Sequence, residues 1–482
     1  MTAFPFIAGA YRARSKNFDA QRCVNLYPEV GSGTSKSVAM LVGTPGMEPW
    51  TSLAATLATS VRGLYRFSDS IAIAVTTDTV YTVDTAGIAT AIGSITAAAT
   101  LVSMADNGSV VMLVTGAQGY FIDPAAGTVT PILDPDFVAG ARVNFLAGRF
   151  VWPQANTGRF QWTSVYGTDV DALSFATAEA SPDVIISQIA GFGELWEFGV
   201  NSTEVFQPSG DADQPFAKVQ GAAMEIGCAA TYSVAKIDSS FFWLGRSDEG
   251  TGIVWRAVNY QPQRVSTHAI EFAIASYGDI SDAIGFTYQQ EGHSFYVLSF
   301  PSADKTWCYD VATNLWHERA WRDPATGDLH AIRAQCQMEF ANSIVVGDRA
   351  SFNLHKWKLD VFTDLVTSDP IARIRACAHL HADLKSQFFK SLQIDMETGV
   401  GLSVDPGDPG YDPQIMLRWS DDGGHTWSNS HWTTMGRIGE YRTRARWRRL
   451  GWSRDRVFEA TITEPVKVCL IGASAEVVVG AN

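Results

Sequence analysis

Arginine side chains gather in one short stretch near the C-terminal end of this 482-residue chain. Residues 437–456 contain eight arginines and two acidic residues, Glu440 and Asp455, and so carry a charge of +6. The net charge of the whole chain is −14, so the other residues together carry −20. Residues two apart on a β-strand share one face at about 6–7 Å. A strand here would therefore present a row of guanidinium groups, which must contact anions. The candidates for a subunit interface or a DNA contact are Arg442, Arg444, Arg446, Arg448 and Arg449.

Three kinds of anion fit such a row. The first is acidic side chains of the same domain or of a neighbouring identical subunit, which suit the bidentate geometry of arginine. The second is the phosphate backbone of DNA, and the third is an anionic glycan. An acidic protein repels a polyanion at long range, which favours the ion pairs. Four tryptophans are expected to pack around the guanidinium groups, partly through cation–π contacts: Trp419, Trp427, Trp447 and Trp452.

The stretch SDDGGHTW at 420–427 matches the Asp-box pattern S-x-D-x-G-x-T-W. An aspartate carboxylate that accepts from backbone N–H groups, together with a glycine, predicts a structural turn. The pattern is common in sialidases and other carbohydrate-active propellers, so glycan hydrolysis is the functional alternative. A single copy outside any repeat favours the structural interpretation. The residues of the box are Ser420, Asp422, Gly424, Thr426 and Trp427.

A second group of polar residues alternates along one predicted strand. Cys377, His379, His381 and Asp383 would share one face, opposite a face that begins with Ile374. Thiolate and imidazole are zinc ligands, yet side chains two apart diverge from a tetrahedral centre. A polar strand face is therefore expected, with no metal and no cofactor. The six cysteines form no C-x-x-C pair, so we expect reduced, mostly buried thiols.

Signatures of catalysis are otherwise missing from the sequence. It contains no G-x-S-x-G, H-E-x-x-H, G-x-x-x-x-G-K-[ST] or G-x-G-x-x-G, the motifs that mark common nucleophile, metal and nucleotide sites. A glycosidase would need two carboxylates that converge on a pocket, and none of the 50 acidic residues can be singled out for that role. The sequence therefore favours a protein that is not an enzyme.

Period-two alternation and Gly, Asn and Asp turn signals run through the whole chain, which predicts an all-β protein. A short unit of strands recurs about every 40 to 50 residues, the spacing of four-stranded propeller blades. The expected starts are residues 61, 99, 142, 186, 234, 284 and 331. We predict a six- or seven-bladed β-propeller with a C-terminal β-sandwich-like domain.

Three segments follow from this pattern. Residues 1–60 form an N-terminal arm or closing strand, residues 61–366 the propeller, and residues 367–482 a β-sandwich-like assembly domain. No uninterrupted apolar run reaches the length of a membrane span, and the N-terminal residues do not match a signal peptide. We therefore expect synthesis in a cytoplasm and no membrane insertion.

Several longer segments resemble one protein family, the tail hub or nozzle proteins of short-tailed bacteriophages, also called packaged DNA stabilization proteins. The resemblance covers most of the chain and is most specific from 392 to 468. The segments that carry it are FFWLGRSDEG (241–250), CYDVATNLWHER (308–319), LQIDMETGVG (392–401), LRWSDDGGHTWSN (417–429) and YRTRARWRRLGWSRDRVFEATITEPVKV (441–468). Looser matches are NLYPE (25–29) and GTPGM (43–47).

The resemblance implies a structural virion protein that is made in the host bacterial cytoplasm and resides in the virion tail. Several copies, six in the best-known relatives, form a ring below the portal-adaptor protein ring. Such a ring extends the channel for packaged double-stranded DNA, retains that DNA, and anchors a tail needle or plug and tailspikes or fibres. On this interpretation the arginine row secures subunit contacts. The alternatives are a carbohydrate-binding or glycoside-cleaving β-propeller and a direct DNA-binding protein.

Overall fold

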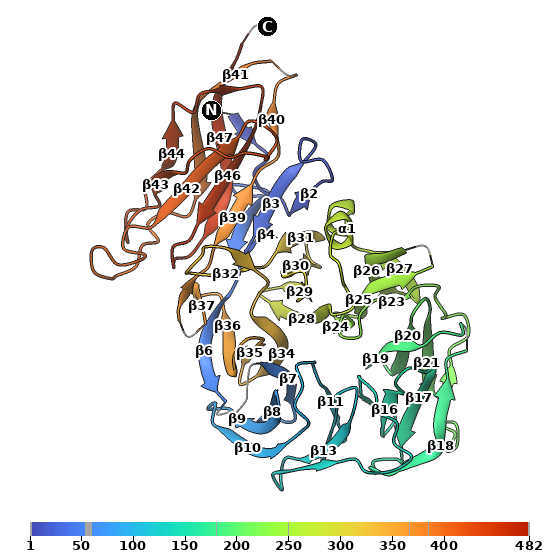
Figure 1. Ribbon diagram of the computed structural model, residues 1–482. Helices are drawn as coiled ribbons and strands as arrows, with labels where there is room; N and C mark the ends of the chain where they lie inside the picture. The colour runs from blue at the N-terminus through green and yellow to red at the C-terminus, as the bar shows by residue number, and fades with distance from the viewer. Residues whose placement is uncertain are drawn as a thin grey trace.

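The computed structural model describes residues 2–53, 60–179, 181–248, 250–365, 367–383 and 385–480. Residues 54–59 of the expected N-terminal arm and residue 366 at the expected propeller boundary lie outside the described residues. Strands dominate, and the one helix among the described residues is α1 (His268–Ala275). Figure 1 shows a ring of small sheets with a two-sheet body above it, in which both chain ends lie.

The ring consists of successive antiparallel units. The first three are β7 (Val61–Arg66), β8 (Ile71–Thr76), β9 (Thr79–Asp84) and β10 (Ala89–Ser94); β11 (Ser103–Asp106), β12 (Val111–Val114), β13 (Gly119–Asp123) and β14 (Thr128–Pro131); and β15 (Asn144–Leu146), β16 (Arg149–Pro153), β17 (Arg159–Thr163) and β18 (Val170–Thr177). The fourth and fifth are β19 (Ile185–Gly191), β20 (Glu194–Gly199), β21 (Thr203–Pro208) and β22 (Phe216–Lys218); and β23 (Gly227–Cys228), β24 (Ala235–Ile237), β25 (Ser240–Ser247), β26 (Gly250–Val258) and β27 (Gln261–Arg264).

Two further units complete the ring. They are β28 (Ile284–Gln290), β29 (His293–Phe300), β30 (Lys305–Asp310) and β31 (Leu315–Glu318); and β34 (Ala334–Phe340), β35 (Ser343–Asp348), β36 (Asn353–Lys358) and β6 (Gly46–Ser52). The last unit thus takes its outer strand from the N-terminal part of the chain. Two short pairs lie outside these units: β32 (Trp321–Arg322) with β33 (Leu329–His330), and β37 (Thr363–Asp364) with β38 (Asp369–Pro370).

An aspartate at the end of a strand fixes the turn that follows it in several units. The carboxylate of Asp84 accepts from the backbone N–H of Ala86 at 2.9 Å and of Ile88 at 2.8 Å. Asp123 accepts in the same way from Ala125 at 2.9 Å. These side-chain turns offer the backbone an alternative to a continued ladder, so β9 and β13 each end at the aspartate.

Apolar clusters between neighbouring units hold the ring together. Between the fourth and fifth units, for example, the rings of Phe198 and Trp243 lie 5.3 Å apart. The cluster that joins the last unit to the first includes Val61 and Val345, both with no exposed surface. The ring therefore closes, as isolated four-stranded sheets could not bury both faces. The seven units formed by the described residues favour the larger of the two predicted blade counts.

The upper body packs two sheets face to face. One contains β1 (Thr2–Phe4), β4 (Leu26–Val30), β5 (Ala39–Gly43), β41 (Gln387–Met396), β44 (Ala445–Arg448), β45 (Trp452–Ser453) and β47 (Cys469–Val479). The other contains β2 (Tyr11–Arg12), β3 (Ala20–Val24), β39 (Arg373–Ala376), β40 (Leu380–His381), β42 (Gln414–Ser420), β43 (His431–Thr434) and β46 (Asp455–Ile462). Their shared core includes Leu392, Ile394, Leu417 and Phe458, all buried. The chain is thus an all-β propeller with a C-terminal β-sandwich.

The N-terminal strands connect the two bodies. Strands β1 to β5 join the sandwich and β6 joins the ring. Strand β3 pairs in parallel with β31, Val24 opposite Glu318, so the sheet of the sixth unit continues into the sandwich. The boundaries predicted at residues 60 and 366 stay predictions.

The polar outer face predicted for the strand at residues 374–383 is wrong. Ile374, Arg375, Ala376 and Cys377 are all buried, and β39 ends at Ala376. The Arg375 guanidinium is satisfied by backbone carbonyls: its Nε donates to Phe6 O at 2.6 Å and its Nη1 to Gly9 O at 3.0 Å. The N-terminal segment therefore covers the face that the alternation assigned to solvent.

Candidate assembly surface

The arginine-rich stretch reaches the edge of one sandwich sheet. Strand β44 pairs with β41 through Leu392 opposite Trp447 and Ile394 opposite Ala445, and it is the last strand on that side of the sheet. Ala445 and Trp447 are buried, because the apolar residues of the alternation face the sandwich core. The arginines between and beyond them face outward.

The predicted row along one strand is only partly correct. Arg446 and Arg448 lie on β44, but Arg442 and Arg444 precede the strand in an irregular segment. Arg449 follows it in a left-handed conformation with φ 62°, and its backbone N–H still donates to Lys390 O of β41 at 2.8 Å. The stretch therefore combines a short edge strand with two irregular flanks.

Among the residues that the structure describes, one of the five candidate arginines forms an ion pair inside its own domain. The Nη2 of Arg446 lies 3.7 Å from Glu476 Oε2 and donates to Ser391 Oγ at 3.0 Å. Within the described part of the chain, the other four are exposed and have no acidic partner. These four, Arg442, Arg444, Arg448 and Arg449, are called the arginine edge below.

Aromatic side chains lie on and beside the arginine edge. Tyr441 precedes it and is 75% exposed, and Trp432, on neighbouring β43, is 59% exposed. The two strands are tied together where the Trp447 indole Nε1 donates to His431 O at 2.9 Å. Arginine, tryptophan and tyrosine are the residue types that dominate binding energy at protein interfaces. The composition of this surface therefore fits a contact with another protein chain.

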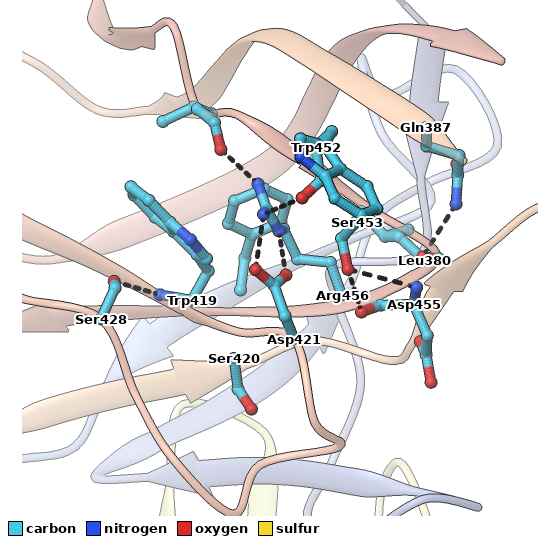
Figure 2. A network of polar contacts seen from close by, with 12 residues as sticks. Leu380, Gln387, Trp419, Ser420, Asp421, Ser428, Trp452, Ser453, Asp455 and Arg456 are labelled. Carbon is cyan, nitrogen blue, oxygen red and sulfur yellow. Dashed lines mark hydrogen bonds and ion pairs between the residues drawn. The ribbon is translucent and has the colours of Figure 1, made fainter. Parts of the chain in front are cut away.

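The last arginine of the stretch has a different role. Arg456 is 2% exposed, and Figure 2 shows its guanidinium directed at Asp421. Its Nε lies 2.6 Å from Asp421 Oδ1 and its Nη2 2.8 Å from Oδ2, while Nη1 donates to Leu450 O. Its centre lies 4.7 Å from the Phe389 ring and 5.3 Å from that of Trp419. Arg456 is therefore part of the sandwich interior.

The Asp-box residues form a closed turn after β42. Asp422 accepts from the Thr426 backbone N–H at 2.8 Å and hydroxyl at 2.6 Å, and from the Ser420 hydroxyl at 2.7 Å. These bonds lower the pKa of Asp422, the Thr426 hydroxyl most. Gly424, with φ 89°, donates its N–H to Ser420 Oγ at 2.7 Å. The carboxylate is occupied by the turn itself, which leaves it unsuited to acid–base chemistry.

The turn also binds the N-terminal segment to the sandwich. Trp427 packs on a small cluster that contains Ala20 and Val457. The Arg418 guanidinium lies 4.8 Å from the Trp427 ring. Of the four tryptophans expected to pack around the arginines of the stretch, Trp419 contacts Arg456, whereas Trp427 contacts Arg418 outside it. The Trp447 indole donates a hydrogen bond and Trp452 is exposed.

The polar residues 377–383 do not converge. Cys377 lies in the core, where burial raises its pKa to about 11. His379 hydrogen-bonds through Nδ1 to Asp455 Oδ2 at 2.8 Å and through Nε2 to Lys16 O at 2.8 Å, and His381 is exposed. Among residues that the structure describes, no group of three or more His, Cys, Asp or Glu side chains could hold a metal ion. Over the same residues, α1 is too short to cross a membrane.

Sequence reasoning missed three residues that organise this body. Arg375 lies on the strand face that alternation assigned to solvent, Arg456 was counted only as part of the arginine-rich stretch, and Asp421 was not singled out. The signal for Arg456 was present: it follows β45 in the apolar stretch that continues as VFEATI, where an isolated charge must be paired. Nothing in the local pattern marked Arg375, because its partners lie more than 350 residues away.

Comparison with protein-family models matches both bodies. A model described as bacteriophage P22 Gp10, beta-propeller, matches residues 2–361. A model described as bacteriophage P22 Gp10, beta-sandwich, matches residues 372–478. Comparison with curated proteins gave no match.

Three of the solved structures that match this chain are distant in sequence. PorZ, a surface component of the type-IX secretion system of Porphyromonas gingivalis, is 11% identical with a TM-score of 0.37, over 63% of this chain and 37% of its own. The N-terminal domain of Nup159 is 9% identical with a TM-score of 0.40, over 68% of this chain and 97% of its own. The designed protein Ika8 is 13% identical with a TM-score of 0.36, over 70% of this chain and 99% of its own.

Proposed function

The chain belongs to the family of bacteriophage P22 Gp10, whose members are structural proteins of the phage tail, and from this premise we propose that it forms the tail hub or nozzle ring. The observation that carries the proposal is the match of both family models, in order, to the propeller and the sandwich. In this role the ring extends the DNA channel below the portal-adaptor ring and retains packaged DNA. It also anchors the needle or plug and the tailspikes or fibres.

The proposed assembly is a homo-oligomer, a hexamer by analogy with the family, and its role is structural rather than enzymatic. The arginine edge supports a subunit contact, because it is exposed, lacks acidic partners among the described residues, and lies beside Trp432 and Tyr441. A neighbouring copy can supply the missing anions, since the chain outside residues 437–456 carries a charge of −20. Packaged double-stranded DNA passes through the channel without a specific site.

The location is tested on particles. Antibody raised against the purified protein is gold-labelled and applied to intact virions from the producing culture, which are viewed by electron microscopy. Label at the distal end of a short tail is the expected result. Virions without label, with signal confined to the cell surface or cytosol, would contradict the proposal and make hydrolysis of bacterial surface polysaccharides the next assay.

The role of the arginine edge is tested separately. A virus in which Arg442, Arg444, Arg448 and Arg449 are all replaced by serine is expected to lack tails carrying this protein, because the subunit contact is lost. The matched control replaces Arg66, an exposed arginine of the propeller paired with Asp69. Tails that assemble normally but lose packaged DNA would assign the edge to DNA contact instead.

A further inference from the structure

A cavity of about 330 Å³ lies where the two bodies meet, between α1, β30 and the β2–β3 hairpin. Figure 1 shows α1 beside β2 and β31 at this junction. Its floor is apolar and includes Ala273, Tyr277 and Trp307. The floor is held firmly, because the Trp307 indole Nε1 donates to the Tyr277 hydroxyl at 2.9 Å. The cavity is thus a built feature of the junction.

The rim of the cavity is strongly basic. Five cations line it against one acid, Glu318. Glu318 is already shared, because its carboxylate lies 3.6 Å from Arg22 and 3.9 Å from Lys305. The other three cations of the rim form no ion pair within the described segments: Arg12, Arg14 and Lys16. In a chain of net charge −14, this is an unusual excess of positive charge.

An apolar floor under a cationic rim selects a particular kind of ligand. It fits a segment that buries an apolar side chain and places carboxylates beside it. The surface of a DNA duplex offers phosphates but no apolar group that could fill a concave floor. The cavity is therefore suited to an acidic peptide segment that carries a small apolar anchor.

The chain itself exposes such a segment. Residues 402–413, LSVDPGDPGYDP, contain three aspartates and no cation, and Val404, just before the turn at 405–408, is 39% exposed. The loop is held in shape by backbone bonds from Leu402 N to Gly410 O at 2.7 Å and from Asp408 N to Asp405 O at 3.1 Å. A preordered loop loses little conformational entropy on binding.

The loop and the cavity lie on different sides of the sandwich. The loop leads into β42, which runs beside β43 on the side away from α1 and β2 (Figure 1). Two different surfaces that fit each other form a head-to-tail contact, and repetition of such a contact generates a ring when the rotation between copies closes. A head-to-tail contact is what a ring of identical tail subunits requires.

We propose that the cavity between α1 and the β2–β3 hairpin receives the acidic loop 402–413 of a second copy of this chain. Val404 enters the apolar floor, and Asp405 and Asp408 pair with the free cations of the rim. This inference rests on the proposed homo-oligomeric ring and specifies one of its contacts. The arginine edge would then contribute to a separate part of the subunit interface.

The test uses the full-length protein and a synthetic fluorescent peptide of residues 402–413. Fluorescence anisotropy is expected to show saturable binding below about 1 mM, that is, a binding free energy stronger than about −4 kcal/mol. Replacing Arg12 and Arg14 by serine is expected to weaken binding about tenfold, the effect of about 1.4 kcal/mol of lost ion pairing. Both side chains are exposed, so these variants should fold.

Two controls make the test specific. Arg448→Ser with Arg449→Ser removes the same charge from the arginine edge and should leave peptide binding unchanged. A peptide with Asp405→Asn and Asp408→Asn should bind about tenfold more weakly for the same reason. Absence of saturable binding, loss of binding in the arginine-edge variant alone, or displacement of the peptide by a short DNA duplex would each overturn the inference. Gold label on the tail together with any of these results would leave the proposed function standing.

Discussion

Arg456 and Asp421 meet side-on, with Nε 2.6 Å from Oδ1 and Nη2 2.8 Å from Oδ2. This bidentate pair joins strand β46 to the turn that follows β42 (Figure 2). Asp421 is 45% exposed in its side chain, whereas Arg456 is 2% exposed. The Arg456 end of the pair is therefore buried and the Asp421 end is partly exposed, and aromatic rings cover the rest of the Arg456 guanidinium. The pair therefore fixes the position of the Asp-box turn on the sandwich.

Replacing Arg456 by methionine is expected to lower the free energy of unfolding of the sandwich by about 3 kcal/mol. The change leaves Leu450 O and Trp452 O without their donor, and breaking a buried pair costs about 3–5 kcal/mol. The measurement is urea unfolding followed by tryptophan fluorescence. Arg448→Met is the matched control, because Arg448 is exposed and such changes stay within about 0.5 kcal/mol. Equal stability of the two variants would show that the pair contributes nothing.

The ring was predictable from the sequence because its interactions are local. The expected starts at 61 and 284 coincide with Val61 and Ile284, the first residues of β7 and β28, while the start expected at 99 precedes β11 by four residues. Apart from β6, which joins the last unit from the N-terminal part of the chain, each unit pairs strands that lie close together in the sequence, so strand length and turn residues can be read from adjacent residues. The spacing of the units alone could not decide between six and seven blades.

The candidate surface was only partly predictable, because its contacts are not local. Alternation placed Ile374 inward correctly, but it also placed Cys377 on the polar outer face, and Cys377 is buried. Alternation reports two faces of one strand and contains no information on a second layer that covers the outer face. For the same reason, alternation could not predict that β3 pairs with β31, because the partners Val24 and Glu318 are far apart in the sequence.

Asp422 should make the stability of the sandwich depend on pH in the acidic range. Its hydrogen bonds lower its pKa in the folded state, so the folded state binds fewer protons than the unfolded state near the unfolded pKa of about 4. The stabilisation is therefore present above that pH and lost as pH falls through the lower folded pKa. Because the side chain is exposed, we expect an effect of about 1 kcal/mol.

The free energy of unfolding is measured by urea unfolding at several pH values, from neutral pH down to the lowest pH at which the protein stays folded. Asp422→Asn should be less stable than the native chain at neutral pH, and the difference should shrink as pH falls. Asp405→Asn, in the exposed loop, is the control and should follow the native curve. A constant difference at all pH values would mean that the amide side chain fails in this turn for steric rather than electrostatic reasons.

The buried Glu197 side chain should give the stability of the propeller the opposite dependence on pH. Burial raises its pKa to about 8, against the hydrogen bond that Gln188 donates to its Oε1. The folded state then binds more protons than the unfolded state between pH about 4.5 and about 8. The contribution of Glu197 to stability is greatest below that window and falls as pH rises through it, by about 1.4 kcal/mol per unit at most.

Glu197→Gln removes the titrating group and should reduce the loss of stability between pH 5 and about 8. Thermal unfolding followed by calorimetry at several pH values measures the slope. The control is Glu339→Gln, since Glu339 is an exposed residue of β34. A slope that persists unchanged in Glu197→Gln would assign the pH dependence to another group.

Arg375 should hold the N-terminal segment on the sandwich. Its guanidinium donates to Phe6 O, Gly9 O and Gln21 Oε1, so Arg375→Met leaves several buried acceptors unpaired at about 1–3 kcal/mol each. We expect the segment that contains Arg12 and Arg14 to open locally and to be cut faster by trypsin, as a mass-spectrometric time course can show. Leu417→Ala is the control, because it weakens the same core without removing a hydrogen bond to this segment. Cleavage spread evenly over the chain in both variants would indicate global unfolding, and the anchoring role of Arg375 would then be wrong.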